Sequence, residues 1–269
     1  MIEIRLVVFV TVLAIMMAAE AIWSKREREN DLLVRWPGNF GVAMLGTVVV
    51  RLLLPLTATG VALSGTENGT GLFNVVAIPS MIVLLASLLL MDMLIYLQHR
   101  VFHAIPLLWR VHRMHHTDLE LDASTGLRFH PIELLLSMLI KLSAIAILGI
   151  PAVAVLIFEM LLNGCSIFNH ANVSLPAGVD ALLRKFVVTP DMHRVHHSVV
   201  PAETDSNFGF CLPWWDRLFG TYTAQPQQGH KDMQIGLASH REQARALRLD
   251  HMLIEPFMQP AVEQRGDKT

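Results

Sequence analysis

The stretch HRVFHAIPLLWRVHRMHH, residues 99–116, holds five of the chain's thirteen histidines. It directly follows the apolar run VVAIPSMIVLLASLLLMDMLIYLQ, residues 75–98, and a similar piece, HRVHH, returns at residues 193–197. An apolar run of about 20 residues is long enough to cross the hydrocarbon core of a bilayer as a helix. The sequence therefore predicts a cluster of histidines at the end of a membrane helix. Residues 193–197 are expected to supply the second half of this cluster.

The composition indicates a membrane protein. The 269 residues are 53% hydrophobic and 16% charged, with a mean hydropathy of +0.46, whereas soluble domains carry about 25% charged residues. The net charge of -2 gives no basis for a nucleic-acid partner. The two cysteines, Cys165 and Cys211, are too few for a disulfide framework or a cysteine-rich zinc site.

Four apolar regions are long enough to cross a bilayer, and they cover residues 1–23, 40–63, 74–98 and 131–168. The first region has small residues near its end, as a signal peptide does. Its basic residues Lys25, Arg26 and Arg28 follow the apolar run, however, whereas a signal peptide carries its basic residues before it. We therefore expect a membrane helix at the N-terminus rather than a signal peptide.

The fourth region, residues 131–168, is too long for one crossing. Gly149 and Pro151 near its middle are expected to break a helix, which leaves either a kinked single crossing or a hairpin of two helices. Only the hairpin returns His170 and residues 193–197 to the side of the first histidine cluster. We therefore expect the hairpin, and an all-α integral membrane bundle of about four to five membrane helices forming a single domain.

The distribution of basic residues predicts the orientation of this bundle. Residues 25–30, KREREN, are rich in positive charge and are therefore expected in the cytoplasm, whereas the loop at residues 64–71 has no Lys or Arg, as is typical of an outer loop. His99 then emerges in the cytoplasm, and we expect the chain to lie in a bacterial cytoplasmic membrane. The parts expected on the cytoplasmic side are a histidine-lined helical cap over residues 99–130 and 169–222 and a C-terminal segment over residues 223–269.

The spacing of the histidines predicts shared helix faces. His99 and His103 are four residues apart, and the two HxxHH groups repeat the spacing i, i+3, i+4. A single histidine is more often a surface or core residue than a ligand, but so many in same-face groups at one membrane face indicate a metal site. The histidines at this face are His99, His103, His112, His115, His116, His193, His196 and His197, with His130 and His170 flanking the fourth apolar region.

Ligand number favours a dinuclear, nitrogen-rich centre, because eight to ten imidazoles are enough for two metals. Imidazole suits zinc, iron and copper alike, so the residues alone leave the metal open. A bis-histidine haem needs lone histidines on facing helices, which disfavours it here. Asp92 lies near the same face of its helix as His99 and is expected to orient an imidazole. Asp191 is a second candidate for this role, unless it only favours the start of its own helix electrostatically.

The ordered series HRVFH, HRMHH, FNH and HRVHH resembles the fatty acid hydroxylase superfamily, which includes sterol desaturases, sterol methyl oxidases, fatty acid 2-hydroxylases and alkylglycerol monooxygenase. TGLRFHPIE after the second motif and PWWDRLFGTY after the last are also similar, and the resemblance covers about Leu88 to Tyr222. Ser166 stands where some members have a further histidine, which makes His130 a candidate tenth ligand. The resemblance assigns as metal ligands His99, His103, His112, His115, His116, His170, His193, His196 and His197.

The resemblance implies a sterol desaturase- or fatty acid hydroxylase-like enzyme with two iron ions that uses O₂ to hydroxylate or desaturate a lipid C–H bond. The chain has no GxGxxG motif after a strand and no HPGG-type haem motif, so electrons are expected from a separate ferredoxin- or cytochrome-like donor with its reductase. A sterol, a fatty acyl chain, an ether lipid and a carotenoid all stay open as substrates. The alternatives from other classes are a membrane metal transporter and a metal-dependent lipid hydrolase.

Overall fold

The computed structural model describes residues 2–29 and 32–258, and these residues form helices and loops with two isolated β-bridges and no strand. The predicted all-α fold is therefore confirmed. Five helices of the described residues are long and apolar enough to cross a membrane. They are α1 (Ile2–Ile22), α2 (Leu32–Leu53), α5 (Ser80–Ala104), α7 (Pro131–Leu148) and α8 (Ala152–His170).

The second predicted span has the wrong limits. The helix expected over 40–63 begins at Leu32 and ends at Leu53, because Pro55 restricts the residue before it to extended conformations. A new helix, α3 (Ala58–Glu67), follows and is capped by Thr57, whose side chain accepts the N–H of Gly60 at 3.0 Å. The short helix α4 (Leu72–Val75) then connects to α5.

The third span, expected over 74–98, also differs in its limits. α5 begins at Ser80, directly after Pro79, and continues to Ala104. His99 and His103 are therefore part of the membrane helix itself, on its last two turns. The chain turns at Ile105, and α6 (Pro106–His116) begins with a proline at its first position, where the missing N–H costs no hydrogen bond.

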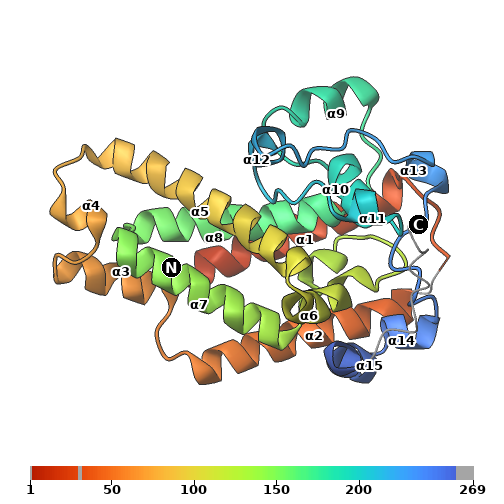
Figure 1. The fold of residues 1–269 in the computed structure, drawn as a ribbon, viewed down its shortest axis with the longest axis horizontal. Coiled ribbons are helices and arrows are strands. Elements are labelled where there is room, and N and C mark those ends of the chain that lie inside the picture. The colour runs from red at the N-terminus through yellow and green to blue at the C-terminus, as the bar shows by residue number, and fades with distance from the viewer. Residues whose placement is uncertain (1, 30–31, 259–269) are drawn as a thin grey trace, which may run out of the picture.

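The region over 131–168 forms the predicted hairpin. α7 ends at Leu148, its C-cap Gly149 adopts the left-handed conformation with φ 67° and ψ 43°, and Pro151 is the N-cap of α8. In Figure 1 the two helices diverge from this turn toward the opposite end of the bundle. The single kinked crossing is therefore excluded, and His170 returns to the end of the bundle that holds α6.

The membrane helices pack in pairs around the hairpin. α1 lies against α8, α2 against α7 and α5 against α8, while α3 contacts both hairpin helices near their turn. The apolar core at this end includes Met91, Ile95, Ile145, Ile150 and Phe158. Large apolar side chains cover the outside of the bundle, as expected for helices that face lipid.

The remaining helices form a cap over one end of the bundle (Figure 1). They are α6, η1 (Thr125–Leu127), α9 (Ala177–Leu183), α10 (Pro190–His196), α11 (Pro201–Thr204), α12 (Trp214–Leu218), α13 (Gly229–Asp232), α14 (Gln243–Leu247), α15 (Leu249–Ile254) and η2 (Glu255–Phe257). The C-terminal segment belongs to this cap, since α15 packs on α2, and Arg113 donates to Glu255 at 2.7 Å. Residues 259–269 of the predicted segment lie outside the described residues.

Candidate metal centre

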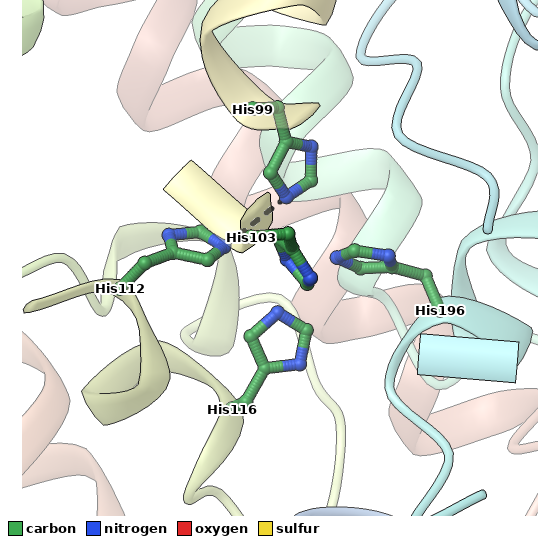
Figure 2. Close-up of side chains that lie close together, drawn as sticks. All are labelled: His99, His103, His112, His116 and His196. Carbon is green, nitrogen blue, oxygen red and sulfur yellow. Dashed lines mark hydrogen bonds between the residues drawn. The ribbon is translucent and has the colours of Figure 1, made fainter. Parts of the chain in front are cut away.

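Nine of the ten predicted histidines lie in two adjacent groups between the membrane bundle and the cap. Within each group, one imidazole nitrogen from every member lies within 4.8 Å of the others. Figure 2 shows the first group, whose five rings point toward a common centre. The first group is His99, His103, His112, His116 and His196, and the second group is His115, His170, His193 and His197.

Each HxxHH motif contributes to both groups. On α6, His112 and His116 belong to the first group, whereas His115 belongs to the second. The assignment is reversed at α10, where His196 joins the first group while the i, i+4 pair of His193 and His197 joins the second. The spacing predicted a shared helix face, but the division of each face between two centres depends on how α6 and α10 are rotated in the fold.

Backbone carbonyl groups fix the orientation of several rings. The Nδ1–H groups of His99 and His196 donate to the carbonyls of Phe208 and Ser206, both at 2.8 Å. His115 and His170 donate in the same way to carbonyls at 3.0 Å and 2.6 Å. An imidazole that donates from Nδ1 keeps its lone pair on Nε2, and this fixed tautomer is typical of metal ligands.

Two carboxylates complete this support, and neither was predicted from the sequence. Glu133 at the start of α7 accepts the Nδ1–H of His112 at 2.7 Å, and Asp205 accepts that of His103 at 3.1 Å. Glu133 is buried, whereas the side chain of Asp205 is 64% exposed. The only local signal was the position of Glu133 in the TGLRFHPIE motif beside the second histidine cluster.

Asp92 has a different role from the one predicted. Its carboxylate accepts the N–H groups of Cys211 and Leu212 at 3.3 Å and 3.2 Å, and the Nε1–H of Trp215 at 2.8 Å. Within residues 2–29 and 32–258 it makes no hydrogen bond to a histidine. Asp92 therefore holds the loop that follows α11, one residue of which, Phe208, supports His99.

Asp191 also contacts no ring of either group in the described structure. It pairs with Lys25 at 2.8 Å and with Arg194, and so joins the end of α1 to α10. Burial raises the pKa of this carboxyl, but Arg194 and Lys25 outweigh burial and hold the pKa below its usual value. Its action on the cluster is therefore limited to holding α10 in place.

His130 lies outside both groups. It is the N-cap of α7, where Nδ1 accepts the N–H of Ile132 at 3.2 Å and Nε2 lies 3.2 Å from the carbonyl of Leu253. Both ring nitrogens therefore have protein partners. The structure gives His130 a capping role and does not bring it to the other nine histidines.

The two groups fit metal ions. Several buried nitrogens have no hydrogen-bond partner among the described residues, among them Nε2 of His103, Nε2 of His196 and both ring nitrogens of His116 and His197. Leaving such groups unpaired costs free energy that a bound metal recovers. Nε2 of His99 lies 3.1 Å from Nε2 of His112. Two nitrogens bound at about 2.1 Å and at right angles to one metal are about 3.0 Å apart, which matches this distance.

The electrostatics also favour neutral imidazoles. Burial, and then the neighbouring rings, lower the pKa of His115, His116 and His197 well below the ordinary value of 6.5. Burial and His112 lower the pKa of His196 to about 3. Because a metal binds the neutral form of histidine, these rings are in the ligating form at neutral pH.

A cavity of about 320 Å³ extends from the first histidine group into the membrane bundle. His99, His112 and Phe210 line it near the cap, and residues of α7 and α8 line it between the diverging hairpin helices. The walls are mostly apolar. The arrangement can therefore hold an apolar chain with one part beside the first histidine group.

Residues 84–221 match the fatty acid hydroxylase family, and this range contains all nine histidines of the two groups. The chain belongs to this family. As a fatty acid hydroxylase family member, it also resembles individual curated proteins. The ornithine lipid hydroxylase OlsE of Rhizobium tropici is 33% identical over 141 residues, which make up 52% of this chain and 42% of the relative.

Two alkylglycerol monooxygenases are further relatives of this family member. The protein of Danio rerio is 35% identical over 136 residues, or 50% of this chain and 29% of the relative, and that of Homo sapiens is 30% identical over 135 residues, or 49% and 29%. The chain thus spans less than half the length of these relatives. No solved structure matches the chain.

Proposed function

We propose that the chain is a membrane-bound oxidoreductase that uses two iron ions and O₂ to hydroxylate or desaturate a C–H bond of a lipid. The observation that carries the proposal is the pair of adjacent, buried histidine groups beside a cavity between membrane helices. The names of the relatives, a lipid hydroxylase and monooxygenases, support the same chemistry.

The ligands proposed for the two iron ions are the two histidine groups. Iron bound there supplies the redox chemistry that the oxidation of an unactivated C–H bond by O₂ requires, with electrons from an external donor. The role of the protein is to keep the imidazoles neutral and their rings correctly oriented, through hydrogen bonds to Glu133, Asp205 and the backbone carbonyls. His130 is not among the proposed ligands.

The cavity is proposed to position the lipid. Phe102, Phe129 and Phe210 line it around the first histidine group and exclude water from the reacting carbon. A chain held in this cavity presents a fixed segment to His99 and His112. Fixing the distance between the reacting groups in this way lowers the entropic part of the barrier.

The placement of the histidines argues against the two alternative classes. Transport sites lie near the bilayer midplane on broken helices, whereas both groups here lie at the cap end of continuous helices. A metal-dependent hydrolase needs a base for its water, but Glu133 and Asp205, the carboxylates bonded to these rings, already accept imidazole protons.

We propose that the cap faces the cytoplasm of a bacterium and receives electrons from a separate ferredoxin- or cytochrome-like protein. Lys25, Arg26 and Arg28 follow α1 at the cap end, which agrees with the excess of positive charge on cytoplasmic segments. The donor is expected to dock on the cap, because the histidine groups are closest to the aqueous surface there.

The test is metal analysis combined with isotope-labelled lipid analysis. Protein purified in lipid nanodiscs is expected to contain about two iron ions per chain and to consume O₂ when reduced. Lipids from producing cells grown under ¹⁸O₂ are expected to gain ¹⁸O on hydroxylation, or to lose two hydrogens on desaturation. Metal flux into proteoliposomes without O₂ use, or lipid cleavage without O₂, would overturn the proposal.

A further inference from the structure

Three charged side chains lie inside the membrane bundle, far from the cap. Arg5 of α1 forms an ion pair with Glu159 of α8. Lys141 of α7 is attracted by Glu159 and repelled by Arg5, but within the described residues it forms no hydrogen bond or ion pair. Counted as ions, two cations and one anion give this part of the bundle a formal charge of +1.

Such a charge is costly inside a bilayer and is rarely kept without a partner. Lys141 does not simply face the lipid, because it lines the cavity that His99 and His112 also line. Ser137 and Asn163 are two further polar side chains of the cavity wall. Ser137 is one helical turn before Lys141 on α7, and Asn163 is one turn after Glu159 on α8. The cavity thus combines a cation and two neutral donors at a distance from the histidines.

We propose that this part of the cavity binds the anionic group of a single-chain lipid. Lys141 supplies the opposite charge, and Ser137 and Asn163 donate hydrogen bonds to the oxygens that a carboxylate and a phosphate share. The volume of about 320 Å³ is at the lower end of the range for ligand sites, which favours one chain over a two-chain lipid. That this lipid is the substrate rests on the proposed function.

The position of Lys141 sets a distance along the lipid. Glu133, which holds His112 at 2.7 Å, lies eight residues before Lys141 on the same helix. Eight helical residues span about 12 Å, so the anion is held about that far from the histidine end. An extended chain covers this distance in roughly ten carbon–carbon bonds. The carbon presented to the first histidine group is therefore remote from the charged end of the lipid.

Equilibrium binding of dodecanoate and dodecan-1-ol to the iron-containing protein in nanodiscs, without reductant, tests the proposal. The protein is expected to bind dodecanoate about 10-fold more tightly than the alcohol, and Lys141→Met to abolish the difference. Lys141→Arg keeps the charge and is expected to keep the preference. Arg51→Met, which removes a cation of α2 that does not line the cavity, is the matched control and is expected to leave the preference unchanged.

A preference for dodecanoate that survives in Lys141→Met would overturn the proposal, as would equal binding of acid and alcohol to the unchanged protein. Dodecyl phosphate separates the two anions, because tighter binding of dodecanoate assigns a carboxylate and tighter binding of the phosphate assigns a phosphate. No turnover is needed, so a Lys141-dependent preference with neither ¹⁸O incorporation into a lipid nor loss of two hydrogens from it contradicts only the proposed function. Oxidation of a lipid without this preference contradicts only the anion site.

Discussion

The carboxylate of Glu133 accepts a hydrogen bond from His112 at 2.7 Å and also lines the cavity between α7 and α8. One residue at the start of a membrane helix thus links the histidine centre to the space proposed for the lipid. It lies only three residues after His130, the histidine that the structure leaves outside the centre.

Replacing Glu133 with Gln is expected to weaken iron binding by about 10- to 100-fold, because His112 loses the charged acceptor that orients its ring. Titration of iron into the metal-free protein measures this change. Asp205→Asn is the matched variant, since Asp205 also accepts from a histidine of the first group but is mostly exposed. A larger loss with Asp205→Asn than with Glu133→Gln would contradict the importance of the buried carboxylate.

His130→Ala is expected to leave the iron content unchanged and to lower the stability of α7 by about 1 kcal/mol, the usual cost of losing an N-cap. His130→Asn supplies another capping acceptor and should recover most of the stability. His112→Ala, by contrast, is expected to reduce the iron content. The measurements are metal analysis and thermal unfolding. A loss of iron from His130→Ala would indicate that His130 is a metal ligand.

Gly149→Ala is expected to destabilise the hairpin by about 1–2 kcal/mol, because an L side chain is strained at a left-handed residue. The added Cβ also meets the side-chain amide of Asn74 at 2.7 Å. Gly164→Ala is the control, since this helical glycine has open space around its Cβ position, and alanine there is expected to stabilise α8 by up to about 1 kcal/mol. Thermal unfolding in detergent compares the two, and equal effects would contradict the turn geometry.

The metal-free protein is expected to lose stability as the pH falls below 6.5. The pKa of His116 and of His197 lies well below 6.5 in the folded state, and that of His196 is about 3. The folded chain therefore binds fewer protons than the unfolded chain at acid pH. The stability these neutral rings contribute is complete above 6.5 and decreases as the pH falls toward their folded pKa values.

Thermal unfolding of chelator-treated protein between about pH 7.5 and pH 5 measures this dependence. A variant at His251, which belongs to neither group, is the control and should keep the same slope. A melting temperature that rises on acidification would mean that the rings gain protons on folding, and would contradict the burial of the cluster.

Much of the fold followed from local signals in the sequence. Gly149 and Pro151 indicated the turn of the hairpin. The need to bring His170 back to the first histidine cluster independently predicted the same hairpin. The predicted limits of the second span were wrong because they followed the apolar run, which continues across Pro55. The helix ends before this proline, which disfavours helical conformation at the preceding residue.

The part of the site that depends on spacing within one helix was predictable. His99 and His103 share a face because they are four residues apart, but Asp92 is seven residues before His99 and therefore about 10 Å away along the axis, too far to touch it. Glu133 and Asp205 reach their histidines across 21 and 102 residues of sequence. Contacts of this kind depend on how the helices pack, which no local pattern contains.

The division of each HxxHH motif between two groups also orders the biosynthesis of the centre. The first group needs His196 and the second needs His193 and His197, all of which leave the ribosome after both helices of the hairpin, and His170 of the second group is the last residue of α8 itself. Neither group can be complete before the hairpin has been translated and folded back. Loading of the proposed metals would thus be a late step that needs histidines from the beginning and the end of the series, and a chain truncated before residue 193 would lack members of both groups rather than of one.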